Sequence, residues 1–588
     1  MKATPTTHNL PLQFEKFTTL AEALDYAAQG KTGYNFYSGR GKLYSALPYA
    51  KLRDDARVLA KKLLSLRVPR GSKVALIADT HPDFVRFFFA CQYAGFVPVP
   101  LPAKIQLNGR QEYIEQLERL LTICQAKLAM ANDDFMPFLV EAATRLDIHF
   151  VGNPQAFDRF PESKTELQPL QLGELAYIQY TSGSTRFPRG VMITQKAVIN
   201  NLASIIKDGV KVRRGDRAVS WLPFFHDMGL VGLLLAPMVC QISVDYLSTR
   251  DFAMRPRIWL KILSENQGTI SFSPPFGYDL AARRLREDEV GSYDLSSWRV
   301  AGVGAEMIRN QTLEFFAEQL KPSGFEAKSF LPCYGMAECS LAVCFGPLGK
   351  GMQLDHVDTK QLAENLKAVP VSPDPNKGID RFNTFVNCGS ILPGYEIEIR
   401  DAGGRVLPER QCGTLYLRGP SVMAGYLGNL KATREVLSPD GWLNTGDIAY
   451  LVGSEVVITG RSKDLIIING RNIWPQDIEY LAELQPEIRT GDATAFSIPN
   501  SQGYDLAVVM VECRESDEQK RLDLVMNLNR LIRKELGIDC IIELVPRNTL
   551  IRTTSGKPSR HATKNDYLQQ LTTEQEENSS EANALSVK

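Results

Sequence analysis

A run of hydroxyl, glycine and arginine side chains follows a short apolar segment, Leu175 to Tyr180. It reads Thr181, Ser182, Gly183, Ser184, Thr185, Arg186, Phe187, Pro188, Arg189 and Gly190. Small residues let backbone N–H groups converge on an anion, and Ser and Thr add hydroxyl donors. Arginine adds a fixed positive charge. The run predicts a loop that holds a polyphosphate, but it is equally typical of a surface turn rich in Ser and Gly.

The loop is not a Walker loop, because no Lys-Ser or Lys-Thr pair follows Gly190. An ordinary P-loop nucleotide hydrolase is therefore disfavoured. Three more clusters follow predicted strands in the same way: 223–229 after 218–222, 274–275 after 269–273, and 304–306 after 299–303. Ligand sites of open α/β sheets lie at the carboxyl ends of strands, so we expect the clusters to form one site.

Five motifs in order resemble the adenylate-forming superfamily of acyl-CoA synthetases, luciferases and peptide-synthetase adenylation domains. They are Thr181 to Thr185 with Pro188-Arg189-Gly190, Tyr334 to Glu338, Thr445-Gly446-Asp447, Gly460 to Asp464, and Ser555-Gly556-Lys557. The resemblance spans nearly the whole chain. Arg186 stands where most members have glycine and Arg189 where most have lysine, which resembles one branch, the fatty acyl-AMP ligases. Arginine keeps the charge and adds a bidentate fork, so this departure preserves phosphate binding.

The resemblance implies that a carboxylate attacks the α-phosphate of ATP, giving an acyl-adenylate and pyrophosphate. It implies ATP and Mg²⁺ as cofactors, with Glu338 as the magnesium ligand, because a carboxylate oxygen suits this metal. Asp447 would accept both ribose hydroxyls, and Arg461 would contact ribose or phosphate. The remaining implied ATP-binding residues are Thr181, Ser182, Gly183, Ser184, Thr185, Arg186, Arg189 and Gly190 at the phosphates, and Gly304, Ala305, Glu306, Tyr334, Gly335, Met336 and Ala337 at the adenine.

The resemblance also assigns the catalytic lysine and the hinge. Lys557 would bridge the substrate carboxylate and the α-phosphate, and Lys463 matches the hinge between two domains; without the motifs each would be an ordinary surface lysine. Residues implied at the acyl site are His226, Asp227, Met228, Phe276 and Tyr278. The apolar stretch 230–238 is expected to wall an acyl tunnel or simply to pack in the core.

A segment from 351 to 378, rich in Gly, Pro and Asp, reads as an irregular insert with one short helix at 355–369. In fatty acyl-AMP ligases an extra segment at this place is thought to hinder the swing to the thioester-forming state; the alternative is a tolerated surface insertion. The resemblance therefore favours acyl transfer to an acyl carrier protein of a polyketide or peptide synthetase. The alternatives are a fatty acyl-CoA synthetase and, in another class, an inactive lipid- or nucleotide-binding protein.

Composition limits the partners and the compartment. Formal net charge is zero, which argues against a nucleic-acid partner and against a DNA-ligase-like nucleotidyl transferase. The 10 cysteines form no C-x-x-C pair, and the group Cys333, Cys339 and Cys344 is expected to be buried or half-buried thiols. The first 13 residues lack a secretory core, and the apolar run 229–240 is too short to span a membrane. We expect a cytoplasmic protein.

The elements that must hold these residues alternate between helix and strand. Apolar spacing predicts helices at 49–66 and 84–94 and strands at 73–77 and 97–101. This rhythm predicts an α/β fold with a parallel sheet, followed by a mostly antiparallel β subdomain at 387–462. A chain of 588 residues should divide into domains. We expect a large N-terminal domain at 1–462, a small, mobile α+β lid domain at 463–571 and a disordered tail at 572–588.

Overall fold

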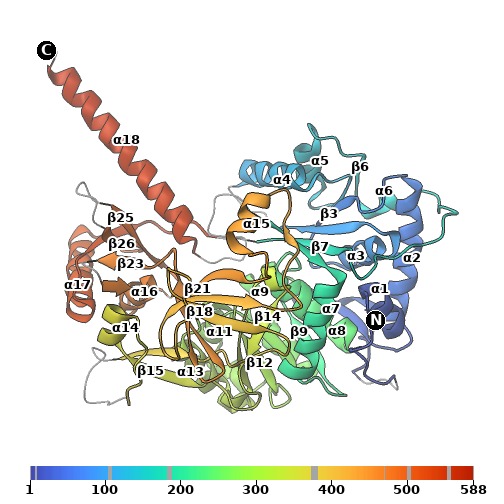
Figure 1. Cartoon of the computed structure of the whole chain (residues 1–588), viewed down its shortest axis with the longest axis horizontal. Coiled ribbons are helices and arrows are strands. Elements are labelled where there is room, and N and C mark those ends of the chain that lie inside the picture. Colours follow the sequence, from blue (N-terminus) through green and yellow to red (C-terminus); the bar gives the residue numbers. More distant parts are fainter. Residues whose placement is uncertain are drawn as a thin grey trace.

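Thirteen strands form the main sheet of the described chain, several of which are labelled in the lower middle of the molecule in Figure 1. The computed structural model describes residues 2–6, 10–103, 109–181, 188–372, 382–468, 471–489, 491–499, 505–552 and 558–586. The parallel strands, in spatial order, are β13 (Phe330–Gly335), β12 (Val300–Val303), β11 (Ile270–Ser273), β9 (Arg217–Ser220), β10 (Ser243–Leu247) and β1 (Gly33–Tyr37), with β2 (Leu43–Pro48) antiparallel at the edge. Helices that connect these strands include α7 (Gln195–Ser204), α8 (Ala236–Val239), α9 (Thr249–Met254), α10 (Arg257–Glu265), α11 (Pro275–Arg283), α12 (Glu287–Val290) and α13 (Asn310–Leu320).

The antiparallel half of this sheet is the predicted β subdomain. It contains β14 (Ala342–Phe345), β17 (Ser390–Ile391), β22 (Glu455–Arg461), β21 (Leu443–Val452), β19 (Gly413–Arg418) and β18 (Glu396–Arg400). Strand β14 turns back antiparallel to β13, so the subdomain continues the first half instead of forming a separate sheet.

A second parallel sheet follows the predicted β-α-β rhythm. Its order is β4 (Val97–Leu101), β3 (Lys73–Ile77), β5 (Leu128–Met130) and β6 (Phe150–Gly152), with helices α4 (Arg110–Cys124), α5 (Met136–Ala143) and α6 (Pro154–Asp158). Helices α2 (Tyr49–Ser65) and α3 (Pro82–Ala94) share one core with the main sheet and with α1 (Leu20–Ala27). Gly95 ends α3 in the left-handed conformation, φ 75°.

A three-stranded antiparallel sheet carries the phosphate loop. Its order is β20 (Gly425–Tyr426), β8 (Gly190–Thr194) and β7 (Leu175–Tyr180). The loop connects β7 to β8, and β8 pairs on its other side with β20, which comes from a stretch more than 200 residues later in the sequence. Helix α15 (Leu430–Val436) follows β20.

The insert is more regular than the sequence indicates, and the short helix predicted at 355–369 is present but shorter, because residues 355–358 belong to a strand. Strand β15 (Leu354–Asp358) pairs antiparallel with β16 (Phe382–Val386), and only α14 (Thr359–Asn365) is helical. The pairing joins segments more than 20 residues apart, so a local reading of residues 355–358 could not find it. Residues 373–381 lie outside the described chain.

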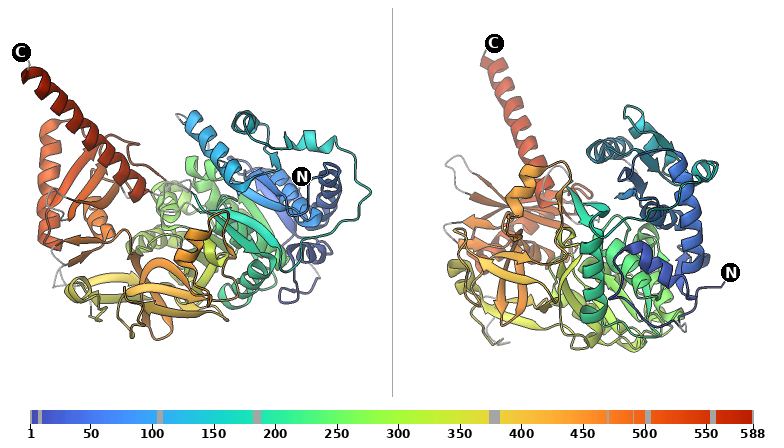
Figure 2. Two further views of the ribbon diagram at one scale, coloured as in Figure 1. Left: turned by 45° about the horizontal axis from the view of Figure 1, so that its top comes forward. Right: turned by 45° about the vertical axis from the view of Figure 1, so that its right-hand side comes forward.

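The small domain has its own sheet and core. Strands β25 (Ala493–Pro499), β26 (Asp505–Glu512) and β27 (Cys540–Val545) pack on α16 (Pro475–Glu483) and α17 (Glu518–Leu536), with β23 (Ile466–Ile468) and β24 (Arg471–Ile473) beside them. Helix α18 (Arg560–Ser586) projects from the body in all views, so helix occupies most of the segment predicted to be disordered (Figure 2). Its helical hydrogen bonds are local and need no partner surface.

All ten cysteines are free thiols, and nine are buried, with Cys333 half-buried. The prediction for the group at 333, 339 and 344 is confirmed. None of the helices in the described ranges has the length and apolar character to cross a bilayer.

Candidate active site

One continuous pocket of about 460 Å³ receives most of the predicted site residues. It is lined by strand ends of the parallel half, by β7 and by the loops around β21 and β22. The predicted residues in its wall are Thr181, Arg189, His226, Asp227, Met228, Ala305, Tyr334, Gly335, Met336, Ala337, Glu338, Arg461 and Lys463. Three of the predicted clusters, those at 181–190, 223–229 and 304–306, therefore contribute to one site, whereas residues 274–275 do not line it.

A buried carboxylate, Asp447, lies behind the polar end of the pocket and contacts two of its lining residues, Tyr334 and Arg461. The Tyr334 hydroxyl donates to Asp447 Oδ2 at 2.6 Å, and Arg461 Nε lies 3.3 Å from Asp447 Oδ1. The charge of Asp447 raises the pKa of Arg461, and burial, aided by the same charge, raises the pKa of Tyr334. Tyr334 therefore stays neutral and donates, while Asp447 keeps acceptor capacity for hydroxyl groups.

Backbone carbonyl groups pass so close to positions 304 and 335 that only glycine fits there. A Cβ on Gly304 would lie 2.6 Å from the Cys333 carbonyl oxygen, and one on Gly335 would lie 1.9 Å from the Leu341 carbonyl oxygen. Ala305 has φ 66° and lines the pocket beside Tyr334. Gly304 and Glu306 flank it without lining the pocket. A small side chain and an aromatic ring in the same pocket wall are the residue types that a purine base packs against.

Glu338 also lines the pocket, and its charge interacts with that of Arg461. The Tyr426 hydroxyl donates to Glu338 Oε1 at 2.8 Å, and the Arg189 guanidinium lies 5.0 Å from the centre of the Tyr426 ring. Removal from water raises the pKa of Glu338, and Asp227 raises it further, whereas Tyr426 and Arg461 oppose the shift. A bound cation would favour the ionised carboxylate.

His226 and Asp227 lie at the junction between the polar and apolar ends. His226 Nδ1 is 2.7 Å from Asp227 Oδ1, which also accepts from the Met228 N–H. Gln179 donates to the Phe225 carbonyl, and its Oε1 is buried with no hydrogen-bond partner among the described residues. Gln179 lines the pocket as well, so this end retains an acceptor for a ligand.

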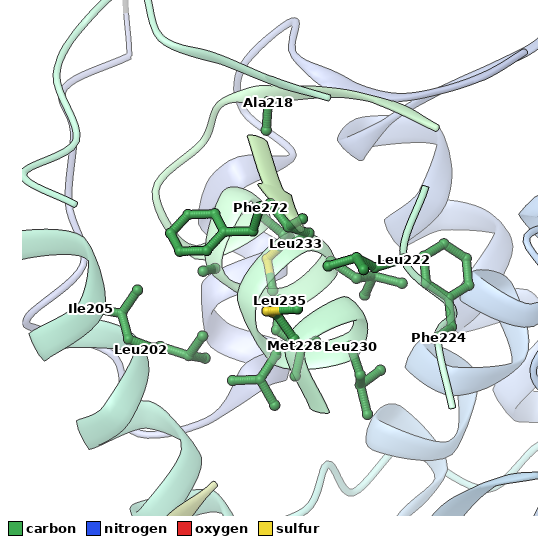
Figure 3. Close-up of a cluster of buried hydrophobic side chains, with 14 of the residues drawn as sticks. Leu202, Ile205, Ala218, Leu222, Phe224, Met228, Leu230, Leu233, Leu235 and Phe272 are labelled. Atoms are coloured by element: carbon green, nitrogen blue, oxygen red, sulfur yellow. The ribbon is translucent and has the colours of Figure 1, made fainter. Parts of the chain in front are cut away.

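The other end of the pocket is an apolar tunnel. Helix η2 (Met228–Leu235), which has π geometry, forms one wall, and Figure 3 shows Ile205, Leu233 and Phe272 among the apolar side chains around it. The lining comprises Ile205, Ile206, Val210, Val212, Ala218, Gly232, Leu233, Ala236, Pro237, Cys240, Ile242, Ile270, Phe272, Leu341, Ala342 and Phe345. Part of the predicted stretch 230–238 thus lines a cavity, and its remaining residues are core.

Strand register shows how far the pocket reaches into the sheet. Ala218 and Ile270 are paired at the amino ends of β9 and β11, whereas Ala305 lies beyond the carboxyl end of β12. The apolar lining therefore reaches to the amino ends of these strands, away from the polar residues at their carboxyl ends.

The structure does not bring two of the predicted acyl-site residues to the pocket. Tyr278 is fully buried in an aromatic cluster with Trp259 and Trp298, and its hydroxyl donates to the Gly302 carbonyl at 2.9 Å. Phe276 packs edge-on against Trp221. Both belong to α11, whose apolar positions face the core. Gly190 is buried behind the wall at the start of β8. Ser182, Gly183, Ser184, Thr185, Arg186 and Lys557 lie outside the described residues.

Sequence reasoning missed Tyr426, Gln179 and the wall of η1 (Ile205–Gly209). Gln179 carried a local signal, because it is a polar residue in an otherwise apolar predicted strand. Tyr426 carried none, since its place in the site depends on β20 pairing with β8.

The profile of the family described as AMP-binding enzyme matches residues 24–427. The chain belongs to this family. It is 44% identical over 566 residues to a Caulobacter vibrioides protein provisionally named an acyl-CoA synthetase, covering 96% of this chain and 98% of that one. It is 31% identical to the medium-chain-fatty-acid–[acyl-carrier-protein] ligase JamA of Moorena producens, covering 94% and 96%.

The comparison with solved structures agrees with this family assignment. A solved chain from work on fatty acyl-adenylate ligases of E. coli and L. pneumophila superposes with a TM-score of 0.91 at 46% identity, covering 96% of this chain and 100% of that one. The resemblance drawn from the five motifs is confirmed, and so is the α/β fold class. As a member of the AMP-binding family the protein is an adenylate-forming ligase that uses ATP.

Proposed function

We propose that the protein activates a fatty acid with ATP to the acyl-adenylate and pyrophosphate, and then passes the acyl group to an acyl carrier protein. The observation that carries the first step is the continuous pocket, which joins a polar end around Asp447 and Glu338 to an apolar tunnel. A fatty acid has this same division, with a carboxylate at one end of an alkyl chain.

The composition of the tunnel walls supports an acyl chain as the ligand of the apolar end. The walls are alkyl and aromatic, so each buried methylene contributes about 0.8 kcal/mol to binding. The imidazole of His226 at the junction would orient the carboxylate by donating a hydrogen bond to it.

The polar end supports the chemistry at phosphorus. Asp447 would accept the ribose hydroxyls, Tyr334 and Ala305 would border the adenine, and Arg189 would contact the outer phosphates. Glu338 offers a carboxylate oxygen in a pocket that would also hold phosphate oxygens, which is the donor set that Mg²⁺ prefers. When bound, the metal supplies positive charge to the triphosphate. Lys557 would bridge the carboxylate and the α-phosphate, and alignment of the reactants supplies much of the remaining acceleration.

The insert supports the carrier protein as acceptor. Asn472 Nδ2 of the small domain donates to the Ala363 carbonyl of α14 at 2.9 Å, and Asn383 Nδ2 of β16 donates to Asp477 Oδ2 of α16 at 3.1 Å. Trp474 packs in the same cluster as Val357 and Leu362 of the insert. These contacts would resist rotation of the small domain, the movement that thioester formation with free CoA requires in this superfamily.

Acyl-CoA synthesis is the second candidate, because the Caulobacter relative is provisionally named for it. One experiment tests both. The protein is incubated with ATP, Mg²⁺ and fatty acids of graded length in three reactions: without an acceptor, with CoA, and with a pantetheinylated carrier protein. Products are identified by mass spectrometry. We expect acyl-AMP in every reaction and an acylated carrier protein in the reaction that contains the carrier protein. Rapid acyl-CoA formation would replace the carrier proposal, and absence of acyl-AMP would overturn adenylation of fatty acids.

A further inference from the structure

Tyr426 contacts both sides of the polyphosphate end of the pocket. Its side chain is 5% exposed, its hydroxyl donates to Glu338 Oε1 at 2.8 Å, and its ring lies 5.0 Å from the Arg189 guanidinium. Arg189 comes from the phosphate loop, and Glu338 comes from the loop after β13. One buried side chain therefore joins the residue assigned to the outer phosphates to the residue assigned to the metal.

The backbone around Tyr426 fixes this arrangement. The Met423 N–H donates to the Glu338 carbonyl at 2.8 Å, the Ala424 N–H to the Met192 carbonyl at 2.9 Å and the Leu427 N–H to the Gly190 carbonyl at 2.8 Å. We call residues 423–427 the strap. It is hydrogen-bonded to the Glu338 loop at one end and to the exit of the phosphate loop at the other, so Tyr426 cannot move independently of either.

The two halves of the Tyr426 side chain make different contacts. The hydroxyl donates to one oxygen of the half-buried Glu338 carboxylate, and this fixes the direction in which the other oxygen points. The Arg189 guanidinium lies over the ring, and it also hydrogen-bonds to the hydroxyl, which opposes the rise in the pKa of Tyr426 caused by burial. Removing the hydroxyl alone breaks the contact with Glu338 but keeps the ring beside Arg189, whereas removing the ring breaks both contacts.

We propose that Tyr426 is a positioning residue whose hydroxyl orients Glu338 for Mg²⁺ and whose ring orients Arg189 for the outer phosphates of ATP. The proposal rests on the ATP-dependent function above, but not on the identity of the acid. The strap would thereby hold Glu338 and the phosphate loop in fixed positions relative to one another.

The experiment measures ATP binding by calorimetry, without fatty acid, so that no reaction occurs. Each protein is titrated with ATP in the presence of a chelator and again with excess Mg²⁺. For Tyr426→Phe we expect unchanged metal-free affinity and loss of most of the gain that Mg²⁺ gives the wild type, by about tenfold or more, as for other partners of metal ligands. For Tyr426→Leu we expect the same loss and, in addition, metal-free affinity reduced by about fivefold.

Tyr395→Phe is the matched control. Tyr395 is also buried, and its hydroxyl lies 3.5 Å from the carbonyl of Cys339, next to Glu338 but not on its carboxylate. It should behave as the wild type in both titrations. Thermal unfolding checks each variant, and if the leucine variant does not fold, the phenylalanine variant alone decides the role of the hydroxyl.

Two results would overturn the proposal. One is a Tyr426→Phe protein whose response to Mg²⁺ equals that of the wild type. The other is an equal loss with and without metal, since the hydroxyl would then serve ATP binding in general. If the wild type binds Mg-ATP as described but yields no acyl-AMP from any fatty acid, the fatty acid assignment fails and the role of Tyr426 stands.

Discussion

Asp447 is the residue on which the nucleotide end of the pocket depends. It is 7% exposed, accepts from Tyr334 and pairs with Arg461, so its carboxylate is held in one orientation. Hydrogen bonds to a charged group contribute about 1.5–3 kcal/mol each, more than neutral ones. Loss of this charge should therefore weaken the binding of ATP and change the binding of the fatty acid little.

Asp447→Asn is expected to raise KM for ATP by about 10- to 100-fold, because one amide oxygen must replace two charged acceptors. KM for the fatty acid should stay within about twofold. Both are measured by pyrophosphate release. Asp440→Asn, at an exposed turn beside Ser438, is the control and should leave both constants unchanged. Equal rises in both KM values would contradict a ribose-specific role.

Lys557 is assigned by its motif. If it stabilises the charge that develops between carboxylate and phosphate, Lys557→Ala should slow acyl-AMP formation by about 10²–10³-fold. The melting temperature should change little. The measurement is a single-turnover assay of acyl-AMP, with Lys520→Ala as control, because Lys520 is exposed and pairs only weakly with Glu515. Wild-type rates in the Lys557 variant would remove it from the chemistry.

At the scale of elements, the tunnel is made where β9 and β11 present small or apolar side chains to helices η1 and η2. Ala218 stands at the amino end of β9, level with Ile270. Neighbouring Val219 is equally buried but points to the other face of the sheet. One strand therefore offers a position inside the tunnel and a matched position outside it.

Ala218→Leu should shorten the preferred acyl chain by about two to four carbons, because the added methylenes occupy the inner end of the tunnel. Val219→Leu should leave the chain-length profile unchanged. Each change is expected to cost about 1–3 kcal/mol of stability by overpacking. The measurement is acyl-AMP yield across fatty acids of graded length. An identical profile in the two variants would show that Ala218 does not set the tunnel's end.

Elements and site differ in how far the sequence could predict them. Strands β3, β4 and β7 match their predicted ranges, because apolar runs bounded by turn residues are local signals. The place of His226 in the site was predicted from its loop after a strand, whereas Tyr334, which lies in β13, was predicted from its motif. The pairing of β15 with β16, the strap and the separation of Tyr278 from the pocket depend on tertiary contacts between distant segments. No local pattern contains that information.

At the scale of the whole molecule, the large domain and the small domain meet around α16. Arg309 forms an ion pair with Glu483, and Asn383 of the insert donates to Asp477. Burial raises the pKa of Asp477 to about 6, although Asn383 and Arg309 oppose the shift. The docked arrangement therefore disfavours the ionised form of this carboxyl group.

Docking of the small domain should therefore depend on pH. Above pH 6 Asp477 is ionised and docking bears the full penalty, about 2–3 kcal/mol for a shift of about two units. The penalty is relieved as the pH falls through 6 toward the ordinary value near 4. We expect docking of the small domain to strengthen between pH 8 and pH 5, and Asp477→Asn to remove this dependence. Docking is measured by fluorescence energy transfer between labels on the two domains. The same pH profile in the wild type and in Asp477→Asn would contradict a role for Asp477.

The continuous pocket that is lined by Arg461 at its polar end and by Ala218 at its apolar end has a consequence for the acyl-adenylate intermediate. Acyl-adenylate is two ligands joined by one bond, so once either end is seated the other is present at a high effective concentration. Release requires both ends to leave together, and the activated acyl group is thereby shielded from hydrolysis until an acceptor arrives. A stable analogue in which a sulfamoyl group replaces the phosphate should bind far more tightly than ATP or the fatty acid alone.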